Sequence, residues 1–136
     1  MAEATSALPI GAYTYLSVVG GTKAVEFYKN AFGAVQEFCN MAEDGKRIMH
    51  ARLRINGAAI LLSDDFPEFC GGGELPKPAG VMIHLEVDDA DKWFKRASDA
   101  GATVIMPLAD MFWGDRYGQV LDPFGHKWSI GAPIKK

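Results

Sequence analysis

FWGDRYGQVLDPFGH, residues 112–126, has the pattern of a strand that runs into a tight turn. An Asp, a Pro and a Gly fall together near its end. Each favours a turn for its own reason: a side-chain hydrogen bond to the backbone, a fixed φ, or freedom at positive φ. The stretch therefore predicts a hairpin, with a strand over 112–121, a turn over 122–125 and a last strand over 126–132.

An earlier stretch has the same plan. Asn56-Gly57 is the strongest short hairpin signal in the chain, because both residues tolerate the positive φ that a type I′ turn requires. Strands are expected on either side of it, over 47–55 and 58–63. In the first of these strands, one face is apolar and the other polar: Met49, Ala51, Leu53 and Ile55 alternate with His50, Arg52 and Arg54.

Each hairpin follows a strand, a helix and another strand. Both expected helices carry apolar residues at helical spacing and end at a glycine. The first half predicts a strand over 13–18, a helix with Thr22 as its N-cap that stops at Gly33, and a strand over 34–41. The second half predicts a strand over 81–87, a helix capped by Asp88 or Asp89 that runs to Ala100, and a strand over 103–108.

The residues repeat together with the elements. Tyr15-Leu16-Ser17-Val18 matches His84-Leu85-Glu86-Val87, for example. One βαβββ unit alone is a curved sheet with a single helix and cannot close a core, whereas two units can. The sequence predicts an α+β fold of two βαβββ repeats in a single domain over residues 1–136, with halves at about 10–63 and 80–133 and a linker loop at 64–79.

Composition excludes several classes of protein. The net charge is −3 and charges of both signs are interspersed, which argues against a nucleic-acid partner. Two cysteines, Cys39 and Cys70, are too few for a disulfide framework and are expected to be free thiols. The chain shows no signal peptide and no apolar run long enough to span a membrane, so we expect a cytoplasmic protein without membrane partners.

Several motifs resemble those of the glyoxalase/bleomycin resistance/dioxygenase proteins, the vicinal oxygen chelate superfamily. Ala24-Val25-Glu26-Phe27-Tyr28 is similar to the first helix of that family, and Asp122-Pro123-Phe124-Gly125-His126 to the hairpin before its last strand. Residues 45–51, 106–110 and 112–118 look like its PhnB-like branch. The resemblance covers residues 10–132. It implies a curved mixed sheet that forms a cup around a ligand, helices on the outer face, and chains paired as a homodimer.

The alternation of residues in the first strand of each half can be compared with such a cup. Thr14, Leu16 and Val18 share one face, as do Ile83, Leu85 and Val87. These apolar sets suit the helix side. The opposite faces then line the cup with Tyr13, Tyr15, His84 and Glu86, which are candidate ligand-binding residues.

Metal-dependent members of the family bind a divalent ion with one His, Gln or Glu from each of four strands. By the resemblance, these positions correspond to Tyr13, Leu61, Met82 and Ser129. None of these side chains is a normal ligand for such a metal. The sequence therefore predicts that the standard metal site is absent and that no cofactor is bound there, and Ser129 becomes a candidate ligand-binding residue.

His84 and Glu86 leave two interpretations open. They could hydrogen-bond a ligand or each other in a polar cup, which we favour, or they could form a shifted metal site with His50. Trp113 and Arg116 are further candidates, because an indole and a guanidinium at a cavity mouth could stack on a ligand and hold an anionic group. The alternative is a turn network of Asp115 and Arg116 with Trp113 at a dimer interface.

Three functional hypotheses follow. The first is a PhnB-like protein that binds a small organic molecule in the cup without the standard metal. The second is a metal-dependent lyase, isomerase or dioxygenase with a shifted site around His84. The third is a structural homodimer without a ligand. The sequence decides neither the ligand nor whether the protein is an enzyme.

Overall fold

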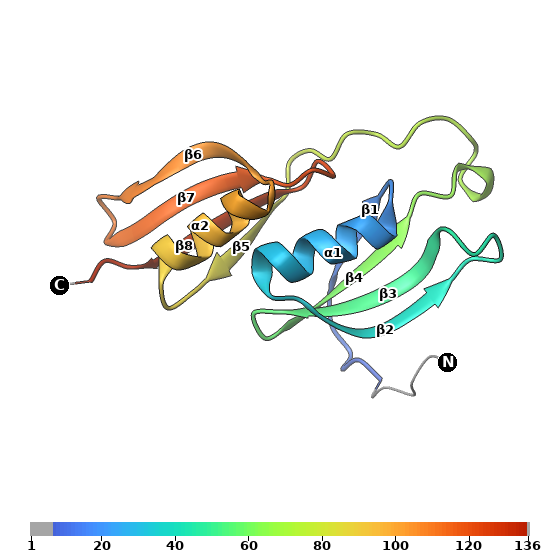
Figure 1. Cartoon of the computed structure of the whole chain (residues 1–136), viewed down its shortest axis with the longest axis horizontal. Helices are drawn as coiled ribbons and strands as arrows, with labels where there is room; N and C mark the ends of the chain where they lie inside the picture. Colours follow the sequence, from blue (N-terminus) through green and yellow to red (C-terminus); the bar gives the residue numbers. More distant parts are fainter. Residues whose placement is uncertain (1–6, 136) are drawn as a thin grey trace. The chain divides into compact units, whose positions relative to one another are not determined.

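A computed structural model describes residues 7–135, which form two compact units (Figure 1). The first unit ends at residue 76 and lacks residues 30–32, which group with the second unit, from residue 77 onward. The boundary lies inside the predicted linker loop. In this loop a single turn of 3-10 helix, η1, spans Pro67–Phe69. No helix in the described range is long and apolar enough to cross a membrane.

The first unit is a four-stranded mixed sheet with one helix. Its strands lie in the order β1-β4-β3-β2; β1 is parallel to β4 and the other neighbours are antiparallel. Helix α1 runs across one face of the sheet (Figure 1). The elements are β1 (Thr14–Val18), α1 (Gly21–Phe32), β2 (Val35–Met41), β3 (Ile48–Ile55) and β4 (Ala58–Asp64).

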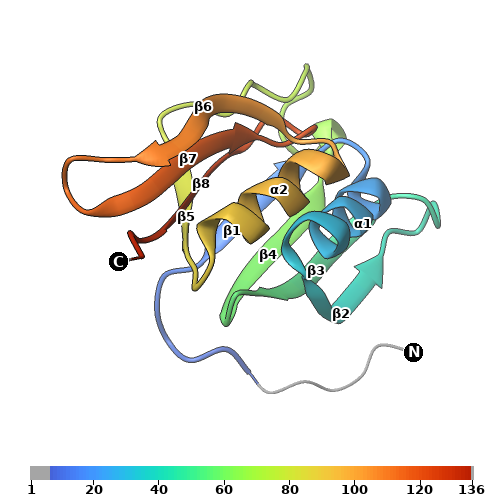
Figure 2. The same ribbon diagram turned by 60° about the vertical axis from the view of Figure 1, so that its left-hand side comes forward.

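The second unit repeats this plan. Its strand order, β5-β8-β7-β6, is equivalent position by position, and β5 is parallel to β8. Helix α2 crosses one face of its own sheet (Figure 2). The elements are β5 (Met82–Glu86), α2 (Ala90–Ala100), β6 (Thr103–Asp110), β7 (Asp115–Leu121) and β8 (Lys127–Pro133). The predicted α+β fold of two βαβββ repeats is confirmed.

Burial follows the predicted alternation in the first strand of each unit. Leu16 and Val18 are buried, as are Leu85 and Val87, whereas Tyr15 and His84 on the opposite faces are exposed. Met49 departs from the predicted pattern of β3, with an exposed fraction of 40%. The register explains this, because Asn40 pairs with His50 and Met41 with Ile48. Met49 is thus the extra residue of a β-bulge.

Most predicted boundaries agree with the structure to within one residue, and three differ by more. The strand β7 begins at Asp115 instead of residue 112, because residues 112–114 form the turn that precedes it. The strand β6 continues to Asp110. Thr22 is not the N-cap of α1: the helix begins at Gly21, after Gly20 in the left-handed conformation, and has no side-chain cap from its own first residues.

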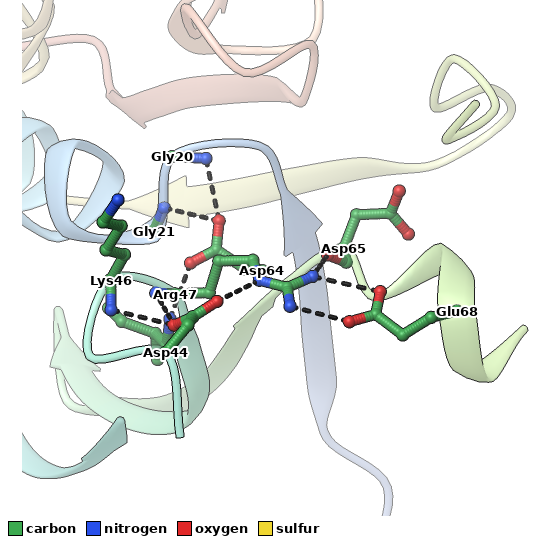
Figure 3. Close-up of polar contacts among 9 residues, drawn as sticks. Gly20, Gly21, Asp44, Lys46, Arg47, Asp64, Asp65 and Glu68 are labelled. Carbon is green, nitrogen blue, oxygen red and sulfur yellow. Dashed lines mark hydrogen bonds and ion pairs between the residues drawn. The ribbon is translucent and has the colours of Figure 1, made fainter. Parts of the chain in front are cut away.

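A distant carboxylate takes the place of that cap (Figure 3). Asp64, at the end of β4, accepts hydrogen bonds from the backbone N–H groups of Gly20 and Gly21 at 2.8 and 2.9 Å. Its other oxygen accepts the N–H of Ile48 at 2.7 Å. The side chain therefore joins α1, β3 and β4, and the negative charge lies where the helix dipole favours it.

Arg47 ties the linker loop to the turn before β3 (Figure 3). Its guanidinium donates to Asp44 at 2.8 Å and to Glu68, in η1, at 2.7 Å, and it lies over the ring of Phe66. Because these charges are paired with one another, we interpret the cluster as a structural link between the loop and the turn.

Candidate functional site

His84 is the centre of a hydrogen-bonded group on the sheet face opposite α2. The parallel register of β5 and β8 places His84 directly beside Ser129. The Nδ1 atom of His84 lies 2.7 Å from Ser129 Oγ, and its Nε2 atom lies 2.9 Å from Glu86 Oε1. The imidazole is therefore held from both sides.

These partners define the tautomer of His84. An ionised carboxylate only accepts hydrogen bonds, so Nε2 carries the proton that points to Glu86. In the neutral imidazole Nδ1 is then an acceptor, and the Ser129 hydroxyl donates to it. Ser129 is only 2% exposed, so its hydroxyl orients the imidazole and is not open to a ligand. Glu86, by contrast, has a side chain that is 61% exposed.

Tyr117 and Gln119, on β7, complete the group and are not among the residues predicted from the sequence. Tyr117 stacks on the imidazole of His84, with ring centroids 6.0 Å apart and planes inclined by 22°. Gln119 Nε2 donates to the Tyr117 hydroxyl at 3.2 Å. The signal was available in the alternation of β7, where Gly118 and Val120 are buried.

Gly131 makes room for this arrangement. It lies on β8 between Glu86 on one side and Tyr117 on the other. A Cβ atom at this position would come within 3.1 Å of His84 Cε1 and 3.4 Å of Tyr117 Cδ1. Only a residue without a side chain lets the imidazole and the phenol approach across the strand without displacement.

Trp113 borders the group. Its indole N–H donates to Asp115 at 3.1 Å, and its ring meets Tyr117 edge-on at 5.7 Å between centroids. Half of the residue, 51%, is exposed, which leaves ring surface open for stacking. We call the set the His84 cluster: His84, Glu86, Trp113, Tyr117, Gln119 and Ser129.

Arg116 lies apart from the cluster. It alternates with Tyr117 and points to the helix side of the sheet, where it binds Asp91 of α2 at 3.0 Å and Asp110 of β6 at 3.1 Å. These hydrogen bonds raise the pKa of Arg116 and lower that of Asp91. The structure therefore brings His84, Glu86, Trp113 and Ser129 together and leaves Arg116 on the other face.

The first sheet carries a related but simpler group. The Tyr15 hydroxyl lies 2.8 Å from Nδ1 of His50, and Phe38 packs edge-on against the same imidazole. Tyr15 and His50 occupy the positions of His84 and Tyr117 in the internal repeat, with imidazole and phenol exchanged. Tyr13 lies before β1, and its hydroxyl donates to the backbone oxygen of Pro9.

The side chains present do not fit the divalent metal that the resemblance implies. The register places Tyr15, rather than Tyr13, beside Leu61, and His84, rather than Met82, beside Ser129. With this register the four positions are Tyr15, Leu61, His84 and Ser129, and only His84 supplies an imidazole. Among residues 7–135 no three His, Cys, Asp or Glu side chains gather in a way that could hold a metal ion.

Comparisons with known proteins agree with this architecture. The family model of the Glyoxalase/Bleomycin resistance protein/Dioxygenase superfamily matches residues 12–130. The uncharacterized protein Mb0911c of Mycobacterium bovis is 48% identical over 126 residues, which cover 90% of this chain and 82% of that protein.

Two solved structures are also similar. Protein PA1353 from Pseudomonas aeruginosa is 27% identical with a TM-score of 0.74, covering 93% of this chain and all of that one. The PhnB protein from Bacillus cereus has the same fold, with a TM-score of 0.70 at 18% identity, covering 89% of this chain and 98% of that one.

Proposed function

Because the chain belongs to the glyoxalase/bleomycin resistance protein/dioxygenase superfamily, we propose that it binds a small organic molecule on the sheet face that carries the His84 cluster, without a metal ion in the standard position. The observation that carries the proposal is the hydrogen-bonded series Glu86–His84–Ser129. It places a fixed imidazole and an exposed carboxylate beside open aromatic surface.

The face has the composition of a small-molecule site. Such sites combine aromatic surface with a few oriented polar groups that determine specificity. Here Trp113 and Tyr117 supply the rings, while Glu86 and Tyr117 supply an acceptor and a donor. Since Ser129 and Glu86 hold His84, little side-chain entropy is lost when a ligand contacts it. Tyr15 and His50 give the first sheet a second, smaller surface of the same kind.

A ligand screen tests the proposal. We would screen small aromatic and polar compounds by thermal shift and confirm hits by changes in the ¹⁵N–¹H spectrum. His84→Ala should weaken hits at least about 10-fold, since it removes the imidazole and releases Glu86 and Tyr117 from their partner. His126→Ala is the matched control, because His126 lies in the turn before β8, outside the cluster.

Two results would contradict the proposal. Hits whose affinities are equal in wild type, His84→Ala and His126→Ala would show that ligands bind elsewhere. Stoichiometric zinc, nickel or iron in protein purified without chelator, lost in His84→Ala, would instead support a metal-dependent enzyme with a shifted site.

A further inference from the structure

The hydroxyl proton of Tyr117 has a weak acceptor within the described structure. The phenol oxygen accepts the Gln119 amide, and its own O–H points to the thioether of Met82 at 3.7 Å. A methionine sulfur is a poor acceptor compared with any oxygen. Tyr117 is therefore an oriented donor with more hydrogen-bonding capacity than its neighbours use.

Gln119 makes this donor stronger and more directional. A hydroxyl that accepts one hydrogen bond becomes a better donor in the next, because the bonds polarise one another. The amide also restricts rotation of the O–H group. The ring itself is fixed between His84 and Trp113, with centroid separations of 6.0 and 5.7 Å.

The charges on this face disfavour an anionic ligand beside Tyr117. Glu86 lies across Gly131 from Tyr117, and Asp115 is two residues away on the same face of β7. Arg116 points to the opposite face and is held by two aspartates. One cation of this sheet, Lys127, lies on this face beside Met82 in the register of β5 and β8, against the two carboxylates of Glu86 and Asp115.

We infer that Tyr117 selects the ligand, and that the ligand is a flat aromatic molecule with a neutral carbonyl oxygen, such as a ketone or an amide. The inference rests on the proposed function and narrows it. The Tyr117 hydroxyl donates to the carbonyl oxygen in place of the Met82 sulfur, and the ligand ring stacks on Trp113. Gln119 is a positioning residue, since it acts through Tyr117.

Three probes that share one bicyclic skeleton test this assignment. 1-Indanone carries a carbonyl oxygen, indane lacks it, and 1-indanecarboxylate replaces it with an anion. Binding to the full chain is followed by ¹⁵N–¹H shift titration. Wild type should bind 1-indanone about 3- to 10-fold more tightly than either of the others, the range expected for one hydrogen bond to a neutral group.

Variants then separate recognition from folding. Tyr117→Phe should remove the preference for 1-indanone over indane and leave indane within about twofold of wild type. Gln119→Met should reduce the preference partly, by about 2- to 3-fold. Gln36→Met, an exposed glutamine of β2 in the first sheet, is the matched control and should change neither probe. A purely structural effect would move indane and 1-indanone equally.

The outcomes are distinct. Binding of 1-indanone at the His84 cluster with no preference over indane, or with a preference that survives Tyr117→Phe, would overturn the role of Tyr117 but leave the proposed function standing. Tighter binding of the carboxylate would overturn the assignment of a neutral ligand. Absence of shifts at the His84 cluster with all three probes and with the screening hits would overturn both proposals.

Discussion

Asp64 is a buried carboxylate that satisfies three backbone donors. It is 5% exposed and accepts the N–H groups of Gly20, Gly21 and Ile48. Each of these donors would otherwise be left without a partner at a helix start or a strand end. Leaving a buried donor unsatisfied costs about 1–3 kcal/mol, so a single side chain has a large effect here.

We expect Asp64→Asn to lower the free energy of unfolding by about 2–3 kcal/mol, because one acceptor oxygen becomes an amide that faces a donor. Urea denaturation followed by far-UV circular dichroism measures this. Asp65→Asn is the neighbouring control, since Asp65 accepts the Arg47 guanidinium through its backbone oxygen. Equal stability of Asp64→Asn and wild type would show that the three hydrogen bonds contribute little.

Contacts of this kind could not be predicted from the sequence. Asp64 and Gly21 are separated by 43 positions, and a cap that reaches across the fold leaves no local pattern. Tyr117 differs, because strand alternation alone would have placed it on the face of β7 opposite the buried Gly118 and Val120. His84, Glu86 and Ser129 were predicted as site residues, but their mutual contacts depend on the parallel register of β5 and β8.

The sequence predicted that either Asp88 or Asp89 caps the N-terminus of helix α2. The structure selects Asp89, whose side chain accepts the backbone N–H of Lys92 at 3.1 Å, while Asp88 precedes it. Asp89→Ala should destabilise the protein by about 1 kcal/mol, and Asp88→Ala by less than about 0.5 kcal/mol. Thermal unfolding of the two variants side by side tests the assignment. The reverse order of stabilities would place the cap at Asp88.

The link between η1 and the turn before β3 depends on protonation. Hydrogen bonds from the Arg47 guanidinium lower the pKa of Glu68 below its usual 4.5. Because the pKa in the folded state is the lower one, the link stabilises the fold above the unfolded value. It is lost as the pH falls through the folded pKa. The link therefore holds η1 to the turn before β3 at neutral pH and is broken in acid.

The variant Arg47→Met distinguishes the causes of the low pKa values of Glu68 and Asp44, the two carboxylates that the guanidinium contacts. The pKa of Glu68 should rise towards its ordinary value, since the guanidinium is the main cause of its shift. The pKa of Asp44 should stay low, because the backbone N–H groups of Arg47 and Lys46 are its main causes. Side-chain ¹³C shifts recorded between pH 2 and 7 report both. A parallel rise of both pKa values would contradict this division.

At the scale of the whole chain, the duplication was predictable and the linker was not. The two halves repeat because hairpin turns, helix-ending glycines and strand alternation are local signals that recur in order. The path of the linker depends on distant partners such as Arg47, which no local signal encodes. The resemblance to the family implied a metal site. The residue types at the four corresponding positions already argued against that site from the sequence alone.

The remaining expectation at this scale is a homodimer. The strand β6 is an edge of its sheet and exposes three consecutive apolar residues, Val104, Ile105 and Met106, by about 40% each. An exposed apolar edge favours association with another chain unless it is covered. Proteins avoid open edges of this kind by pairing or covering them, and pairing with a second copy is the simplest closed solution.

Light scattering at micromolar concentration should therefore give twice the chain mass of 14.8 kDa. Ile105→Lys should shift the protein towards the monomer, since a buried unpaired lysine opposes association. Thr103→Lys is the control on the same strand, outside the apolar run, and should remain dimeric. A wild-type monomer would contradict the expectation, and a dimer that persists in Ile105→Lys would place the interface on a surface other than β6.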